Sequence, residues 1–161
     1  MYQKFLFIGI LGFTLLACKN KEAEETQITQ EQITFQQEGK LQIQTEDGSK
    51  AYFNIEIAET NYETETGLMY RESMEQNQAM LFVFEDVRPH NFYMKNTYIP
   101  LDLFFIKEDK TIATIIENAK PMDETSLPSE VPVQYVLETN AGIAKLWNIK
   151  VGDTVDWKRL K

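Results

Sequence analysis

An aspartate inside an apolar run constrains this chain more than any other feature of its sequence. Asp102 is followed by Leu103–Ile106, Leu-Phe-Phe-Ile, which has the composition of a buried strand. A carboxylate in such a run is expected to be at least partly buried, and a buried charge requires an ionic partner or hydrogen-bond donors. The nearest polar residues precede a turn at Ile99-Pro100: Lys95, Asn96 and Thr97. The stretch Phe92–Ile106 therefore predicts a polar cluster on a hydrophobic scaffold.

The rest of the pattern predicts a mainly β domain. Short apolar or alternating segments that are separated by turn residues are typical of strands. We expect about seven of them, with these cores: 41–44, 53–57, 79–84, 103–106, 111–116, 133–138 and 154–157. Their hairpin-like spacing, without long helices in between, favours an antiparallel sandwich or a small barrel with one or two short helices.

The helices are expected at two places. Thr60 and Glu63 fit a capping box, which predicts a helix from Thr60 to about Met74. Gly67 lies inside that range and costs on the order of 1 kcal/mol relative to alanine, which indicates close packing or a helix broken into two turns. A second, amphipathic helix is expected at 143–147.

The segment Asn118–Pro132 is predicted to be a loop. It contains three prolines and three acidic residues. A loop of this length in a compact domain is more often functional than incidental, so it is a candidate for part of a site.

The first residues have the pattern of a bacterial lipoprotein signal. Residues 1–4 carry one positive charge, residues 5–16 are apolar, and Ala17 precedes Cys18. The apolar run is shorter than the roughly 20 residues that a membrane-spanning helix needs. We therefore expect residues 1–17 to be a signal peptide and Cys18, the only cysteine, to be lipidated. An ordinary cleaved signal or an uncleaved anchor is the alternative.

Composition divides the mature chain into a tether and one domain. Residues 18–38 are rich in Glu, Gln, Thr and Lys and poor in apolar residues, which predicts a flexible acidic tether. Residues 39–161 are long enough for a single β-rich domain whose core holds without disulfides. The net charge of −9 argues against nucleic-acid binding and against attachment to anionic lipid. The membrane is then a partner only through lipidated Cys18, which predicts a location in the cell envelope.

Several motifs of this domain resemble one family. They are residues 66–71, 79–84 and 92–102, followed by 135–138 and Ala141-Gly142. In order and spacing they resemble the domain of unknown function family 192, a small, mostly β domain of bacteria and archaea that is often exported. The resemblance covers roughly residues 53–157, and Ala79 and Tyr93 stand where the family commonly has glycine and tryptophan. It implies a fold and brings no known activity.

The polar residues inside these motifs are the candidate ligand-binding residues: Arg71, Lys95, Asn96, Thr97, Asp102 and Glu138. One interpretation gathers them at the mouth of the barrel or sandwich as a site for a small polar ligand. The other interpretation is structural. In that case Arg71 or Lys95 forms an ion pair with Asp102, and the two residues after Lys95 satisfy backbone groups of the turn.

Catalytic residues are scarce. His90, the only histidine, follows Pro89 in a loop and is expected at the surface rather than as a base. A zinc site would have to rest mainly on carboxylates, which zinc sites seldom do, so we predict neither a metal nor a cofactor. Asp102 and Glu138 could serve as the acid and base of a glycosidase.

Two functions therefore remain open. The first is a lipid-anchored binding module for a small polar or carbohydrate-like ligand or a protein partner. The second is a hydrolase that uses Asp102 and Glu138. The first is favoured because the sequence contains no recognisable pair of nucleophile and base. The sequence names neither the ligand nor the membrane leaflet.

Overall fold

The computed structural model describes residues 33–161, which form a mainly β domain with two short helices, as predicted. The predicted signal peptide, Cys18 and most of the predicted tether lie outside the described residues. The elements in chain order are β1 (Gly39–Gln44), β2 (Lys50–Ala58), α1 (Asn61–Thr66), β3 (Gln78–Arg88), β4 (Asn91–Phe92), β5 (Leu101–Ile106), β6 (Ile112–Ala119), β7 (Leu127–Pro128), β8 (Val133–Asn140), α2 (Ile143–Leu146) and β9 (Thr154–Arg159).

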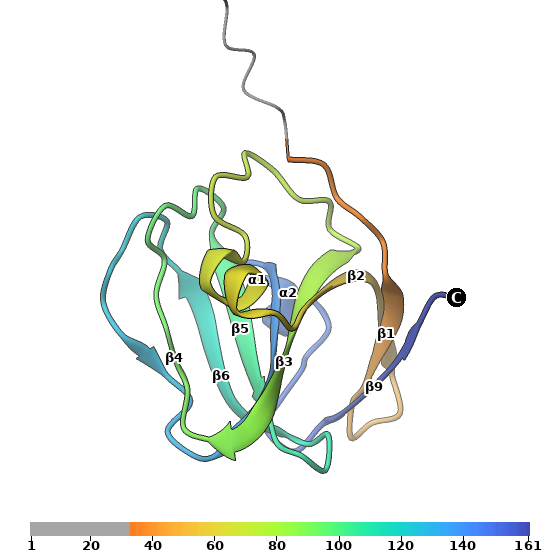
Figure 1. Ribbon diagram of the computed structural model, residues 1–161. Coiled ribbons are helices and arrows are strands. Elements are labelled where there is room, and N and C mark those ends of the chain that lie inside the picture. The colour runs from red at the N-terminus through yellow and green to blue at the C-terminus, as the bar shows by residue number, and fades with distance from the viewer. Residues whose placement is uncertain (1–32) are drawn as a thin grey trace, which may run out of the picture. The chain divides into compact units, whose positions relative to one another are not determined.

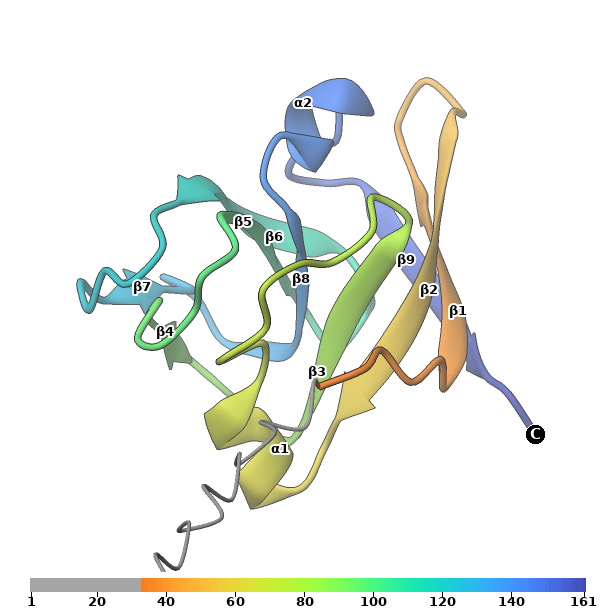
Figure 2. The ribbon, with the colours of Figure 1, turned by 90° about the horizontal axis from the view of Figure 1, so that it is seen from above.

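Seven strands form one curled sheet in the order β6-β5-β8-β3-β2-β1-β9 (Figure 1). The strands β4 and β7 form a separate two-stranded ribbon (Figure 2). Of these two strands, β7 lies inside the predicted loop segment 118–132. A bridge between Thr111 and Thr154 joins the two edges of the large sheet at one end. The sheet is therefore a half-barrel, which confirms the predicted fold class.

One pair of strands departs from the predicted antiparallel pattern. The strands β2 and β3 run parallel, with Ile55 opposite Ala79, whereas the other paired strands of the sheet are antiparallel. A parallel pair needs a crossover connection, and residues 59–77 supply one that carries α1.

The helix α1 begins as predicted and ends early. Thr60 Oγ1 accepts a hydrogen bond from the Glu63 backbone N–H at 3.3 Å, and Glu63 Oε2 accepts one from the Thr60 N–H at 2.9 Å, which completes the capping box. The predicted extension to Met74 is wrong, because Gly67 has φ 48° and ψ −129°. Only glycine adopts that conformation without strain, so the helix ends at Thr66.

Replacing Gly67 with alanine is expected to destabilise the domain by about 1–3 kcal/mol. A Cβ at this position would lie 3.0 Å from Phe82 Cζ, in addition to the strain of the positive φ. Gly48→Ala is the matched control, because Gly48 also has a positive φ but has no atom within 4 Å of a built Cβ. Urea denaturation measures both variants. Equal losses would show that the close contact with Phe82 contributes nothing.

The sheet buries apolar side chains on both of its faces. One face packs against α2 and includes Leu81 and Phe104, together with Ile143 from the helix. We call it the α2 face. The opposite face carries a second cluster around Phe82 and Leu103, which also contains Leu68 from the segment after α1. We call it the α1 face, and the candidate site lies there.

The last residues of the predicted tether belong to the domain. The Gln36 backbone N–H donates to Glu56 Oε1 at 2.6 Å, and Glu38 Oε2 accepts from the Ile57 N–H at 2.7 Å. Both partners are in β2. The interpretation of residues 36–38 as a free tether is therefore wrong, because their polar groups supply hydrogen bonds that β2 uses.

Candidate functional site

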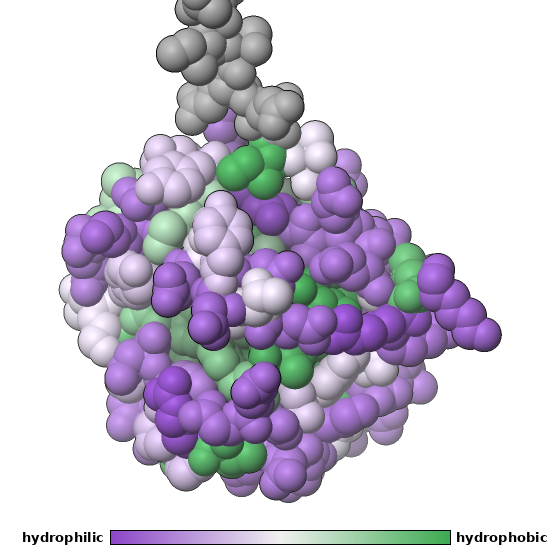
Figure 3. All heavy atoms as spheres, in the orientation of Figure 1, coloured by the Kyte–Doolittle hydropathy of each residue, from purple (hydrophilic) through white to green (hydrophobic). Residues whose placement is uncertain are grey.

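A cavity of about 830 Å³ lies on the α1 face, between α1, the second half of β3 and β4. Its wall is aromatic, and acidic side chains surround it. The aromatic residues are Phe82, Phe84, Phe92 and Tyr93, and the acidic ones are Glu59, Glu65, Glu85 and Asp86. On the face seen in Figure 3, apolar side chains show between hydrophilic ones in this region. The volume lies within the range of small-molecule sites.

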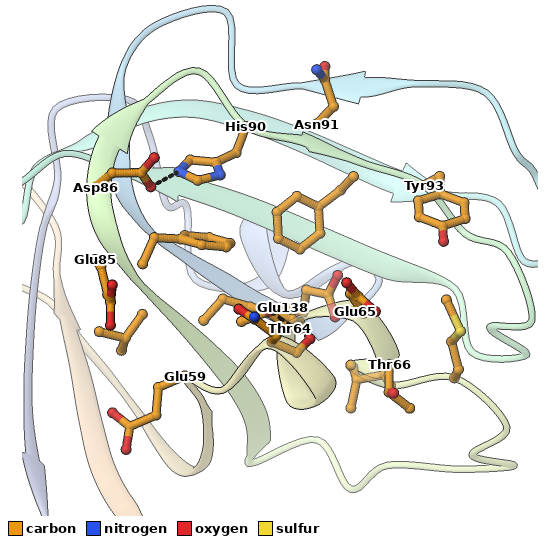
Figure 4. A pocket seen from close by; sticks show the side chains of 18 of the residues that line it. Glu59, Thr64, Glu65, Thr66, Glu85, Asp86, His90, Asn91, Tyr93 and Glu138 are labelled. Carbon is orange, nitrogen blue, oxygen red and sulfur yellow. Dashed lines mark hydrogen bonds and ion pairs between the residues drawn. The ribbon is translucent and has the colours of Figure 1, made fainter.

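Glu138 lines the cavity from β8 and is 5% exposed (Figure 4). Its neighbours across the sheet are Met80 and Leu103, two apolar residues of the α1 face. Burial alone raises the pKa of Glu138 to about 8, and no partner within the described residues offsets that effect. Glu138 is therefore mostly a neutral acid at pH 7, with one hydrogen to donate and oxygens that accept.

His90 is buried beside the same cavity, so the prediction that it lies at the surface is wrong. It is 4% exposed, and its ring stacks on Phe84 with ring centroids 3.8 Å apart. Its backbone N–H donates to Ser129 Oγ at 3.1 Å, which holds the segment against the loop after β7. Burial lowers the pKa of His90, and its Nε2 has no hydrogen-bond partner in the described chain. Asp86 Oδ1 is 3.8 Å from that nitrogen, as Figure 4 marks.

The aromatic wall is held by contacts among its own rings. The Phe92 ring meets Phe82 edge-on, with centroids 5.0 Å apart and an interplanar angle of 90°. The same ring meets Phe84 at 6.3 Å and Phe105 at 5.9 Å, again nearly perpendicular. Such edge-to-face contacts stabilise the arrangement, so the wall is formed before any ligand arrives.

Asp102 is fully buried, as expected, but its partners are backbone groups. Its Oδ1 accepts from the Asn118 N–H and its Oδ2 from the Ala144 N–H, both at 2.9 Å. The predicted ion pair of Asp102 with Arg71 or Lys95 is wrong. Ala144 is the second residue of α2, whose N-cap residue Gly142 has no side chain to offer. Asp102 therefore caps α2 from β5 and acts as a structural residue.

Four of the other predicted residues lie on the loops near α1. Arg71 Nη2 is 2.6 Å from Glu56 Oε2, and both side chains are mostly buried. Asn96 Nδ2 donates to Tyr70 Oη at 2.7 Å, which brings this loop beside the segment that carries Arg71. Thr97 Oγ1 donates to the Lys95 carbonyl at 3.2 Å, and the Lys95 side chain is exposed. These contacts fit the structural interpretation.

Asp102 and Glu138 point to opposite faces of the sheet. In the pairing of β5 with β8, Thr139 lies opposite Asp102, and Glu138 lies opposite Leu103. Successive residues of a strand point to opposite faces, so Asp102 lies on the α2 face and Glu138 on the α1 face. A glycosidase needs two carboxyl groups on either side of one bond. The predicted pairing of these two residues as acid and base is therefore wrong.

Sequence reasoning found Glu138 and missed the wall and the rim of the cavity. Phe82 and Phe84 are two residues apart in β3, so the strand period already placed both on one face. The rim residue Glu65 lies in the predicted helix as well as in α1, but its place at the cavity depends on distant strands that no local pattern reveals. Among residues 33–161, no group of three His, Cys, Asp or Glu side chains is placed to hold a metal ion. Within the same range, no helix combines the length and the apolar content that crossing a membrane requires.

Comparison with known proteins gives a family. Residues 42–157 match the family DUF192, described as Uncharacterized ACR. A protein from Sinorhizobium meliloti 1021 named "putative transcription regulator" has 40% identity and a TM-score of 0.74, over 78% of this chain and 96% of that one. A protein of unknown function from Novosphingobium aromaticivorans DSM 12444 has 37% identity and a TM-score of 0.71, over 73% of this chain and 84% of that one. No curated protein matches the chain.

Proposed function

This chain belongs to the DUF192 family, and from that premise we propose that its domain binds a small hydroxyl-bearing ligand, such as a saccharide, in the cavity on the α1 face. The observation that carries the proposal is Glu138, a buried carboxyl group at the cavity whose hydrogen-bonding capacity the described chain leaves unused. No hydrogen bond within the described chain occupies this carboxyl group, so it is free to bond with a ligand in the cavity. A ligand hydroxyl both donates and accepts, and so it complements a neutral carboxylic acid.

The remaining lining supports the same ligand class. Aromatic rings such as those of Phe84 and Tyr93 offer surfaces against which the C–H faces of a sugar ring can pack. The acidic rim disfavours phosphate and carboxylate ligands by repulsion. The cavity volume of about 830 Å³ accommodates a mono- or disaccharide.

Binding is favoured over hydrolysis and over DNA binding. The predicted hydrolase pair does not form, because Asp102 lies on the other face of the sheet from Glu138. The transcription-regulator name belongs to the Sinorhizobium protein. The net charge of −9 of this chain opposes approach to nucleic-acid phosphates.

The binding proposal predicts that one or more members of a panel of neutral mono- and disaccharides bind the domain in isothermal titration calorimetry. Glu138→Leu should weaken that binding by about tenfold or more, because the hydroxyl loses its buried partner. Glu117→Leu is the matched control, since Glu117 is an exposed residue of β6 outside the cavity lining. Failure of the whole panel, or equal affinity of the Glu138→Leu variant, would contradict the proposal.

We propose further that the domain is attached to the cell envelope through lipidated Cys18. The short apolar segment that ends at Ala17-Cys18 supports this attachment. With Cys18→Ser, labelled fatty acid should no longer enter the protein, and the protein should move from the membrane to the soluble fraction. Metabolic labelling followed by fractionation measures both effects. Equal labelling of wild type and variant would rule out this cysteine as the attachment site.

A further inference from the structure

The cavity lining carries an excess of acidic groups. Five carboxyl side chains line it, and Arg88 is the single lysine or arginine among the lining residues. Arg88 Nε already contacts Asp86 Oδ2 at 2.6 Å, and Glu59 pairs with Arg159 outside the cavity. Within residues 33–161, the other three acids form no ion pair: Glu65, Glu85 and Glu138.

Glu138 is the observation that separates this site from an ordinary acidic surface. Exposed carboxylates such as Glu65 are satisfied by water and need no partner. Glu138 lines the cavity, and only 5% of its surface is exposed. Within residues 33–161, its carboxyl group forms no hydrogen bond. A cation placed beside a buried carboxyl group stabilises its ionised form, which neither hydroxyl groups nor apolar contacts do to the same extent.

The wall is also suited to a positive charge. Cations are attracted to the faces of aromatic rings within about 6 Å of the centroid. Burial lowers the pKa of His90, which favours the uncharged form of its ring beside the cavity. No lysine lines the cavity.

We infer that the ligand carries a positive charge as well as hydroxyl groups, as an amine-bearing saccharide does, with the ammonium group directed to Glu138. This inference rests on the proposed function and narrows its ligand class. When the ligand binds, the Glu138 carboxyl group gives its proton to solvent, and the ammonium group replaces that proton as its partner. Binding therefore releases up to one proton per ligand.

The test compares two disaccharides that differ in one substituent per ring. The β-1,4-linked dimer of glucosamine carries ammonium groups where cellobiose carries hydroxyl groups. Calorimetric titration at about pH 6, where such amines are protonated, should show affinity for the amine that is at least about tenfold higher. Repeating the titration in two buffers of different ionisation heat should show proton release with the amine. Glu138→Gln should abolish that release, whereas the control Glu117→Gln should retain it.

Each outcome decides the inference separately from the proposed function. The inference is overturned if cellobiose binds as tightly as the amine or more tightly, or if neither compound binds. The proposed function is tested separately, by the titrations with the panel of neutral saccharides. If Glu138→Gln does not fold, the double variant Glu65→Gln with Glu85→Gln replaces it. Removing both rim charges should weaken binding of the amine several-fold more than it weakens binding of cellobiose, because only the amine carries a positive charge. Unchanged binding of the amine would overturn the inference.

Discussion

Replacing Glu138 with glutamine is expected to remove a large part of the pH dependence of this domain's stability between pH 4.5 and about 8. Burial raises the pKa of the Glu138 carboxyl group in the folded protein from 4.5 to about 8. Below pH 4.5 the group is protonated in both the folded and the unfolded chain. Between the two values only the unfolded chain ionises, so the free energy of unfolding falls as the pH rises. Above about pH 8 both states ionise and the decline stops.

The size of the effect follows from the two pKa values. The interval from 4.5 to about 8 corresponds to roughly 5 kcal/mol at about 1.36 kcal/mol per pKa unit. Urea denaturation at pH values near both ends of this interval measures it. The Glu138→Gln variant should match wild type at the acidic end and exceed it by several kcal/mol at the basic end. Glu117→Gln should follow wild type throughout, and parallel profiles for wild type and Glu138→Gln would contradict the expectation.

Asp102→Asn is expected to destabilise the domain by about 2–4 kcal/mol, because a charged acceptor of two buried N–H groups becomes a neutral amide. The amide oxygen can accept from only one of these groups in that geometry, and the amide nitrogen faces the other donor. Chemical denaturation near pH 7 measures the loss.

Lys95→Met provides the companion test. Because Lys95 is exposed and Asp102 is held by backbone groups, the lysine variant should change stability by less than about 0.5 kcal/mol. The double variant should show the sum of the single effects. A coupling energy above about 1 kcal/mol between the two substitutions would contradict the structure, because it would indicate an ion pair between Lys95 and Asp102.

Local pattern predicted the seven strands of the large sheet, the places of the two helices and one residue of the site, but not the β4–β7 ribbon. The strand β5 was recognisable from its apolar run, and the capping box at Thr60 fixed the start of α1. Glu138 was singled out through a family motif. These features depend on neighbouring residues in the sequence, which is why a single chain reveals them.

The partners of Asp102 and the burial of His90 depend on distant parts of the chain. The two N–H groups on Asp102 lie 16 and 42 residues further along, and a backbone donor leaves no mark in the side-chain pattern. His90 follows a proline, which indicates a loop, yet Phe84 from β3 stacks on its ring. Gly67, which lines the cavity, ends α1 in a conformation that its residue type permits but does not dictate.

The position of β1 in the sheet affects the order in which the domain folds. β1 lies between β2, which follows it directly, and β9, which is the last strand of the chain, with Gly39 opposite Arg159. During synthesis, the edge of β1 that faces away from β2 therefore stays unpaired until β9, the last strand, has been made. Pairings between the ends of a chain are slow to form, and an unpaired edge is open to wrong partners in the meantime. A chain that stops before Thr154 would keep every cavity residue and still leave this edge uncovered.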